Sequence, residues 1–185
     1  GMTEASHQMS SSPMPPGKRI PGTVGLATGV EVAIMDMAAT GKLQKAGDIG
    51  EIVIKGENVM HGYNNNPEAN AEAFVDGWFR TGDQGFLDPE GYLALTGRIK
   101  ELINRAGEKI SPLEIDGILL KHPAVSEAVC FAVPDEKYGE VVHAAVVLNG
   151  DADQEAIRTY GREQMAELKG PDGGYIAESL PSTAT

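Results

Sequence analysis

The sequence has few aromatic residues, a single cysteine and a shortage of basic side chains. Cys130 is the only cysteine among 185 residues, so no intrachain disulfide can form and a reducing compartment fits best. The longest apolar runs, such as residues 141–148, fall far short of the roughly 20 residues that span a bilayer. The 15 basic and 27 acidic residues give a formal net charge of −12. This balance argues against binding the phosphate backbone of nucleic acids, which needs clustered Lys and Arg.

Two common nucleotide-binding motifs are also missing. No Gly-x-x-x-x-Gly-Lys-Ser/Thr phosphate loop occurs, and no Gly-x-Gly-x-x-Gly follows a predicted strand. His7 and His61 lack a second ligand at metal-binding spacing, so we assign no metal to either of them. A site for one nucleotide remains possible, because a few local groups can hold one. The content of 41% hydrophobic and 23% charged residues is typical of a folded globular protein.

The hydrophobic pattern changes near residue 98. Before it, short segments such as residues 30–34 and 51–56 alternate with turns, which predicts a β-rich part, either a small barrel or a distorted sheet. Residues 78–79 and 85–87 predict two further short strands. Pro67 predicts the start of a short helix.

Residues 99–185 alternate helices and strands. Ser111 followed by Pro112, with Glu114 three residues after the serine, is typical of a capped helix start. Strands are expected over 125–133 and 141–148, and a helix over 153–168. The fold class is therefore α+β: a β-rich domain over 1–98, then a compact α+β domain over 99–185.

Residues 78–83 (WFRTGD) carry the strongest local indication of a binding site. Gly82 lets the chain bend, and Asp83 then presents a carboxylate at a strand end. A carboxylate in that place can accept two hydrogen bonds from a vicinal diol such as that of ribose. The alternative is an aspartate that only satisfies the amides of a turn.

A basic segment, residues 97–109, lies at the change of pattern. Arg98 could bind a diol or a phosphate, and two small domains joined by one short segment can rotate about it. The alternative is a solvated linker with loose surface ion pairs. Gly107 is expected to supply a positive φ in a tight hairpin.

Two further features bear on chemistry. Thr3 and Glu4 place a hydroxyl beside a carboxylate, which suits phosphate contact and Mg²⁺ binding when ATP is present, and equally suits a helix cap. Cys130 lies within an apolar segment, where a buried thiol is expected rather than a nucleophile.

Ordered motifs along the chain resemble those of the acyl-adenylate-forming enzymes, which include the acyl-CoA synthetases. The motifs are residues 1–4, 50–52 with 62–63, 78–83, 97–103, 107–112 and 133–140. They cover almost the whole chain. Within the family, the chain most resembles the C-terminal portion of enzymes in the branch that contains oxalyl-CoA and peroxisomal acyl-CoA synthetases.

The resemblance implies a two-step reaction. A small carboxylic acid attacks the α-phosphate of ATP to give an acyl-adenylate and pyrophosphate, and coenzyme A then forms the thioester. On this resemblance Thr3 would contact the α-phosphate, Glu4 would hold Mg²⁺, Asp83 would bind both ribose hydroxyls and Arg98 would support the ribose.

The resemblance also implies a domain movement between the two steps. Lys100 would be the hinge residue, and Ala106 and Gly107 would line the tunnel for the pantetheine arm of coenzyme A after the small domain rotates. The family's phosphate loop would precede Gly1. Residues 181–185 resemble a closing motif that stops before its lysine, so no complete catalytic set is expected.

Because the phosphate loop and the closing lysine are not part of this chain, we expect that the chain alone does not form an acyl-adenylate. We also expect that it self-associates through exposed apolar surface. Its other expected partners are a small carboxylic acid and coenzyme A, with no nucleic acid and no membrane span. The compartment is expected to be intracellular, either cytoplasmic or peroxisomal. The alternatives are a non-catalytic nucleotide- or protein-binding module and one half of a split ligase.

Overall fold

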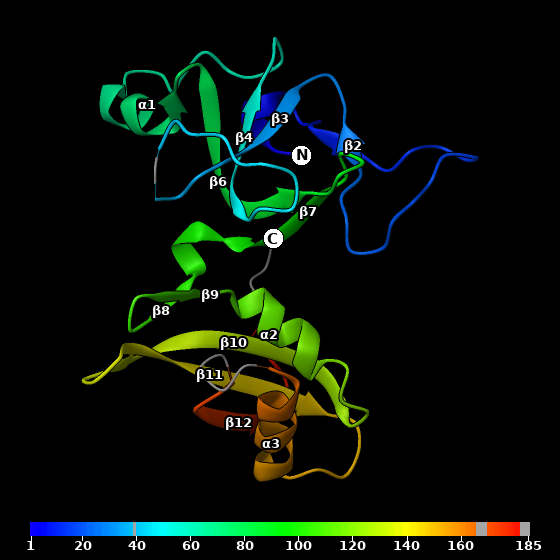
Figure 1. Cartoon of the computed structure of the whole chain (residues 1–185). Coiled ribbons are helices and arrows are strands. Elements are labelled where there is room, and N and C mark those ends of the chain that lie inside the picture. Colours follow the sequence, from blue (N-terminus) through cyan, green and yellow to red (C-terminus); the bar gives the residue numbers. More distant parts are fainter. Residues whose placement is uncertain (39, 166–169, 182–185) are drawn as a thin grey trace. The chain divides into compact units, whose positions relative to one another are not determined.

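The computed structural model describes residues 1–38, 40–165 and 170–181. The chain forms two compact units, Gly1–Ile99 and Lys100–Thr185, each with its own hydrophobic core. Helices and antiparallel strands occur in both, which confirms the α+β class (Figure 1). The roles that we assign to the two domains remain predictions.

The first unit is built on an open five-stranded sheet. Its strands follow the order β3 (Glu31–Met35), β4 (Gly50–Lys55), β6 (Trp78–Leu87) and β5 (Phe74–Val75), and β7 (Leu93–Arg98) also pairs with β6. All of these pairings are antiparallel. Because the sheet is not closed, the distorted-sheet alternative is correct and the barrel is wrong. Around the sheet lie the short elements η1 (Thr3–Ala5), β1 (Ser10–Ser11), β2 (Leu26–Ala27) and α1 (Pro67–Ala73).

The prediction of two short strands on either side of Gly82 is wrong, because β6 is one ten-residue strand. Gly82 has a φ of +73°, and the pairing of β6 with β4 changes register beside it. A left-handed residue bends a strand without ending it when neighbouring strands pair on both sides of the bend. The bend therefore lies inside a sheet rather than in a loop.

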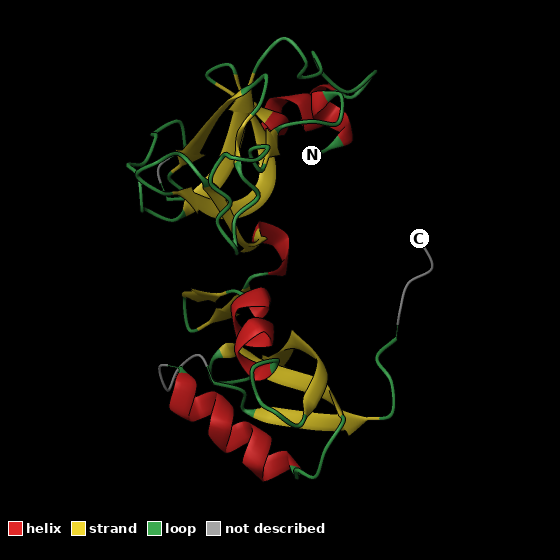
Figure 2. Cartoon of the chain, turned by 90° about the vertical axis from the view of Figure 1, so that its right-hand side faces the viewer, coloured by secondary structure: helices red, strands yellow, loops and turns green. Residues whose placement is uncertain are grey.

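The second unit is a sheet with two helices on one face (Figures 1 and 2). Its strands follow the order β10 (Val125–Asp135), β11 (Gly139–Leu148), β8 (Ile103–Arg105) and β9 (Glu108–Ile110), and β12 (Gly173–Ala177) pairs in parallel with β11. Between the two units' sheets, the chain passes through the short helix η2 (Ile99–Glu101). The helices are α2 (Pro112–Leu119) and α3 (Gln154–Gln164). Ile115, Leu119 and Ile157 from these helices share a core with Val142 and Val146 of β11.

Local sequence features set the helix boundaries. Ser111 occupies the N-cap position of α2 as predicted, although its side chain makes no cap hydrogen bond. At α3, the Asp153 carboxylate accepts a hydrogen bond of 2.8 Å from the Ala156 amide. A Cβ at Gly161 would lie 3.3 Å from Leu119 Cδ2, so glycine lets α3 approach α2 closely. The predicted helix over 153–168 is too long, because α3 ends at Gln164 and Met165 is extended. Leu168 and most of the closing motif at 181–185 fall outside the described residues.

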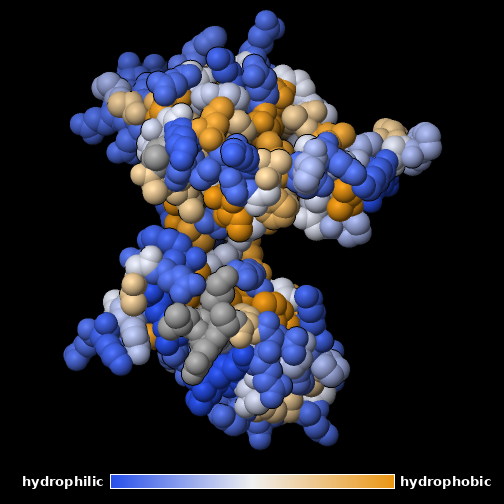
Figure 3. Space-filling view, viewed as in Figure 1, coloured by the Kyte–Doolittle hydropathy of each residue, from blue (hydrophilic) through white to orange (hydrophobic). Residues whose placement is uncertain are grey.

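Large apolar side chains reach the surface of both units, as Figure 3 shows for one face. The most exposed include Met14, Ile49, Leu113, Tyr175 and Ile176. Self-association would depend on such surface, and it stays a prediction. No helix in the described part of the chain is long and apolar enough to cross a membrane.

Candidate functional site

Asp83 and Arg98 contact each other from neighbouring strands. They are paired residues on β6 and β7, and Arg98 Nε lies 2.9 Å from Asp83 Oδ1. The Asp83 side chain is 21% exposed and that of Arg98 58% exposed. A charge-assisted contact of this length orients the carboxylate. The structure therefore brings together the two residues that the sequence suggests for one sugar.

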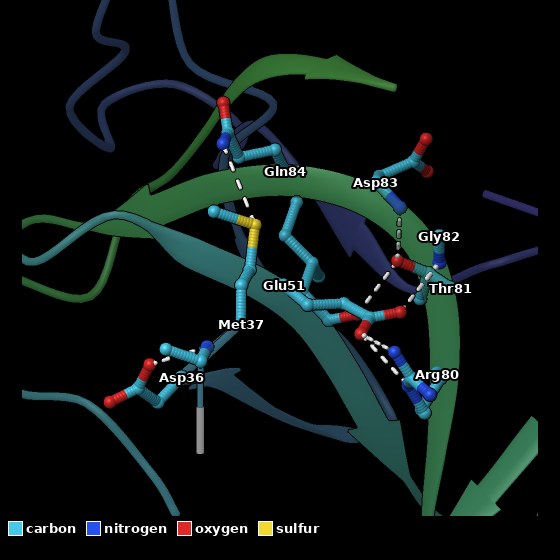
Figure 4. Close-up of polar contacts among 10 residues, drawn as sticks. Asp36, Met37, Glu51, Arg80, Thr81, Gly82, Asp83 and Gln84 are labelled. Carbon is cyan, nitrogen blue, oxygen red and sulfur yellow. Dashed lines mark hydrogen bonds and ion pairs between the residues drawn. The ribbon is translucent and has the colours of Figure 1, made fainter. Parts of the chain in front are cut away.

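The amides at the bend bond to side chains other than Asp83. The Gly82 N–H donates to Glu51 Oε1 at 3.2 Å, and the Asp83 N–H donates to Thr81 Oγ1 at 3.1 Å. The alternative role for Asp83, satisfying these turn amides, is thus taken by Glu51 and Thr81. Figure 4 shows the Asp83 carboxylate on the side of β6 that faces away from Glu51.

An ion pair between the buried Glu51 and the half-buried Arg80 lies beside the bend, and it was not predicted from the sequence. Glu51 is 3% exposed, and its Oε2 lies 2.8 Å from Arg80 Nε and 2.7 Å from Arg80 Nη2 (Figure 4). A buried carboxylate needs such partners, because desolvation penalises the charge. The indication available in the sequence was an acid at the head of the apolar run Ile52-Val53-Ile54.

The Thr3–Glu4 segment forms part of the short helix η1. The N-cap residue of η1 is Met2, so the helix-cap alternative for Thr3 is wrong. The Tyr63 hydroxyl donates to Glu4 Oε1 at 3.2 Å. Partial burial and the neighbouring Glu4 carboxylate raise the pKa of Tyr63 above its ordinary value. The structure therefore joins the motif at residues 1–4 to the motif at 62–63.

The predicted hinge and tunnel residues lie in or near the second unit. Lys100 is exposed in η2, and the division between the two units falls directly before it. Ala106 and Gly107 form the turn between β8 and β9 with φ values of +51° and +93°, which confirms the positive φ at Gly107. Two consecutive positive φ values are typical of a tight hairpin. The Ala106 N–H donates to the Tyr138 carbonyl at 2.8 Å.

Cys130 is a buried thiol, as predicted. It is 4% exposed, and its backbone N–H donates to Asp116 Oδ1 at 2.6 Å. Burial and the nearby Asp116 carboxylate raise the pKa of the thiol, which suppresses the reactive thiolate. Among the residues that the structure describes, no group of three or more His, Cys, Asp or Glu forms a metal site.

Two family models match the chain. The model of the AMP-binding enzyme matches residues 1–64, and that of the AMP-binding enzyme C-terminal domain matches residues 114–185. Together they include Thr3, Glu4 and most of the second unit. Asp83, Arg98 and the hairpin lie between the two matched ranges.

Curated relatives match over the full length of this chain. The chain is 54% identical over 188 residues to an oxalate–CoA ligase of Saccharomyces cerevisiae, and it covers 34% of that relative. It is 50% identical over 187 residues to an oxalate–CoA ligase of Arabidopsis thaliana, and it covers 36% of that one. The chain thus spans about a third of the length of these relatives.

Solved structures of similar proteins also match this chain. ATP-bound MatB from Rhodopseudomonas palustris matches with a TM-score of 0.92 and 36% identity, over 99% of this chain and 37% of that one. O-succinylbenzoate coenzyme A synthetase from Bacillus subtilis, solved with ATP and a magnesium ion, matches with a TM-score of 0.81 and 36% identity, over 98% of this chain and 37% of that one. Family models, relatives and structures agree: this chain belongs to the AMP-binding enzymes, the acyl-adenylate-forming family of the acyl-CoA synthetases.

Proposed function

We propose that this chain supplies the ribose-binding strand and the small domain of an ATP-dependent acyl-CoA synthetase. In the first step a carboxylate oxygen attacks the α-phosphorus of ATP, and the bond to pyrophosphate breaks. In the second step the thiol of coenzyme A attacks the acyl carbon, and AMP leaves. The contact between Asp83 and Arg98 carries this proposal, because it fixes a carboxylate at the bend of β6.

The Asp83 carboxylate would accept hydrogen bonds from both ribose hydroxyls. An ionised carboxylate is an acceptor only, so a vicinal diol with two donors matches it well. Arg98 supports the sugar from β7 and holds the Asp83 side chain through the 2.9 Å contact. Hydrogen bonds to a charged group contribute more than neutral ones, so this pair would anchor the nucleoside end of ATP.

Thr3 and Glu4 would serve the phosphate end. Thr3 is exposed and offers a hydroxyl to the α-phosphate. Mg²⁺ keeps several waters and is usually bound by one or two carboxylates together with substrate phosphates, so the single Glu4 carboxylate fits it. Bound there, Mg²⁺ would neutralise phosphate charge during attack at phosphorus. Tyr63 orients the Glu4 carboxylate through its hydroxyl.

Lys100 and the β8–β9 hairpin would serve the second step. One site that performs two reactions needs a moving part, and a short connection between two compact units provides one. We assign the pivot to Lys100, and the lining of the pantetheine tunnel to Ala106 and Gly107. The substrate acid is proposed to be a small dicarboxylate, supported by the identities of 54% and 50% to oxalate–CoA ligases. The single buried thiol suits a reducing compartment, the cytoplasm or the peroxisome.

The test is a chimera of the yeast relative. The matching segment of the Saccharomyces cerevisiae oxalate–CoA ligase is replaced by this chain, and formation of the oxalate thioester from ATP and coenzyme A is measured. We expect an active chimera in which Asp83→Asn lowers kcat/KM for ATP about tenfold or more, because each hydrogen bond to a charged group is worth about 1.5–3 kcal/mol.

Asp76→Asn is the matched control, because Asp76 is exposed and its φ of +50° suits asparagine equally well. This control should keep the activity of the unsubstituted chimera. A folded chimera without adenylate formation, or Asp83→Asn activity equal to that of the control, would contradict the proposed function.

A further inference from the structure

Glu51 is a buried acid whose carboxylate bonds to one short stretch of the neighbouring strand. It sits in β4 with 3% exposure, followed by the buried residues Ile52, Val53 and Ile54. A carboxylate in such a position is stabilised only if its oxygens are bonded. Its Oε2 bonds to Arg80, and its Oε1 accepts from the Gly82 amide.

These contacts lie at a bulge in β6. Glu51 pairs with Gln84 and Val53 pairs with Arg80, so Thr81, Gly82 and Asp83 together oppose the one residue Ile52. The extra residues of a bulge leave backbone groups outside the regular ladder. Here the Gly82 amide, in a residue with a φ of +73°, bonds to the Glu51 carboxylate.

Thr81 holds the same bulge from within. Its side chain is buried, and the hydroxyl donates to the Ile52 carbonyl at 2.7 Å. The same oxygen accepts from the Asp83 amide at 3.1 Å. One hydroxyl thus joins the backbone of β4 to the backbone of the residue proposed to bind ribose (Figure 4).

The Glu51 carboxylate and the Thr81 hydroxyl bond to the amides of Gly82 and Asp83, so they fix the backbone that leads into Asp83. Bulges re-aim side chains at binding sites, and a site held about 1 Å too loosely loses most of its effect. We propose that Glu51 and Thr81 are positioning residues that aim Asp83 at the ribose hydroxyls, an inference that rests on the proposed function of Asp83.

A purely structural pair would behave differently from a positioning pair. Loss of stability alone lowers the amount of folded enzyme, and it lowers activity with every nucleotide by the same factor. Loss of aim at Asp83 removes only the benefit of the ribose hydroxyls. The ratio of kcat/KM for ATP to that for 3′-deoxy-ATP therefore separates the two roles.

The experiment uses the chimera described above. Unsubstituted, it should prefer ATP over 3′-deoxy-ATP about tenfold or more. Glu51→Gln and Thr81→Val should bring this ratio to within about threefold of unity, mainly through a loss with ATP. Thr81→Ser keeps the hydroxyl and should keep the ratio. Glu57→Gln removes an exposed acid after β4 and is the matched control for Glu51→Gln.

Thermal unfolding of each variant shows whether it is folded. If either Glu51→Gln or Thr81→Val fails to fold, the other variant still tests the inference. If Glu51→Gln and Thr81→Val lose activity but keep the unsubstituted ratio, the two residues are structural and the inference is overturned. If the unsubstituted chimera makes thioester without preferring ATP over 3′-deoxy-ATP, the ribose role of Asp83 itself fails. If it makes no adenylate, the proposed function fails, so the three results are distinct.

Discussion

Arg105 Nη2 lies 2.8 Å from Asp172 Oδ1, and this contact ties the β8–β9 hairpin to the start of β12. The Arg105 side chain is only 10% exposed, and its guanidinium also lies 5.0 Å from the centre of the Tyr138 ring. The hairpin that carries Ala106 and Gly107 is therefore held by residues distant in the sequence.

Asp172→Asn should loosen this hairpin, because it removes the carboxylate charge from the 2.8 Å contact with the Arg105 guanidinium. The expected cost is about 1–3 kcal/mol, and it should appear as faster hydrogen exchange of the Ala106 amide in the full chain. Trp78 is the only tryptophan and lies in the first unit, so its fluorescence melting curve serves as an internal control. Unchanged exchange at Ala106 would show that the ion pair does not hold the hairpin.

Ala106→Gly should stabilise the second unit. Ala106 has a φ of +51°, a conformation that costs an L-residue about 1–2 kcal/mol and costs glycine almost nothing. Part of that gain is offset by the larger conformational freedom of glycine in the unfolded chain, so the expected net gain is about 0.5–1 kcal/mol.

Hydrogen exchange of the core amides of β11 measures this gain. Ala156→Gly, in the first turn of α3, is the matched control and should destabilise the same unit by about 0.5–1 kcal/mol. Destabilisation by Ala106→Gly as large as that by Ala156→Gly would contradict the strain argument.

The neighbouring glycines Gly173 and Gly174 should respond to alanine in opposite directions. A Cβ at Gly174 would meet Ala144 O at 3.5 Å and Gln154 Cγ at 3.9 Å, which are ordinary contacts. It would point toward a recess under α3 lined by residues such as Val146 and Ile157. We expect Gly174→Ala to stabilise the second unit by about 1 kcal/mol, through a buried methyl group and a stiffer unfolded chain.

Gly173→Ala is the control and should destabilise the second unit. A Cβ there would lie 2.6 Å from Cε1 of His143. The His143 ring packs against Phe131 and Tyr175, with centroid distances of 6.2 Å and 5.8 Å, so moving it disturbs these contacts. Thermal unfolding of both variants, followed by far-ultraviolet circular dichroism, tests the pair. Equal shifts of the melting temperature in the same direction would contradict the different surroundings described for the two Cβ positions.

The stability of the second unit should fall as pH rises through the raised pKa of Asp116. Burial raises that pKa above the ordinary value of about 4, although hydrogen bonds from the Cys130 side chain and amide partly oppose the shift. A carboxyl group with a raised folded-state pKa binds its proton more tightly in the folded chain. Its stabilising contribution is therefore complete below the unfolded-state pKa and is lost above the folded-state pKa.

Asp116→Asn should flatten this pH dependence and raise stability at pH 7, because the amide oxygen can still accept from the Cys130 N–H. Hydrogen exchange of core amides of β10, measured between pH 4 and 7 and corrected for intrinsic rates, gives the profile. Asp153→Asn is the control, since asparagine also caps helices. An unchanged profile in Asp116→Asn would assign the pH dependence to other groups.

Short-range features of this chain could be predicted because their causes are local. Asn66 caps α1 by accepting from the Ala69 amide, and Pro67 follows it as expected. Ser111 and Pro112 mark the start of α2 in the same way. The left-handed φ at Gly107 follows from the tight hairpin. Each of these depends on residues within one turn of one another.

Long-range partners could not be predicted in the same way. The sequence contains Glu51 and Arg80 as ordinary charged residues, and nothing in the spacing pairs them. Gly82 suggested an interruption of the strand, whereas pairing with β4 and β7 keeps β6 continuous through the bend. Register between strands depends on the whole sheet, so local propensity cannot specify it.

Short stretches of sequence were enough to predict the family, the α+β class and the ribose-binding candidate, because ordered motifs and caps are properties of adjacent residues. Packing between distant segments selects the side chains that bond to the backbone next to Asp83 and the side chains that hold the hairpin. Those choices depend on strand register and on the need of buried charges for partners, and both arise only when distant segments pack together.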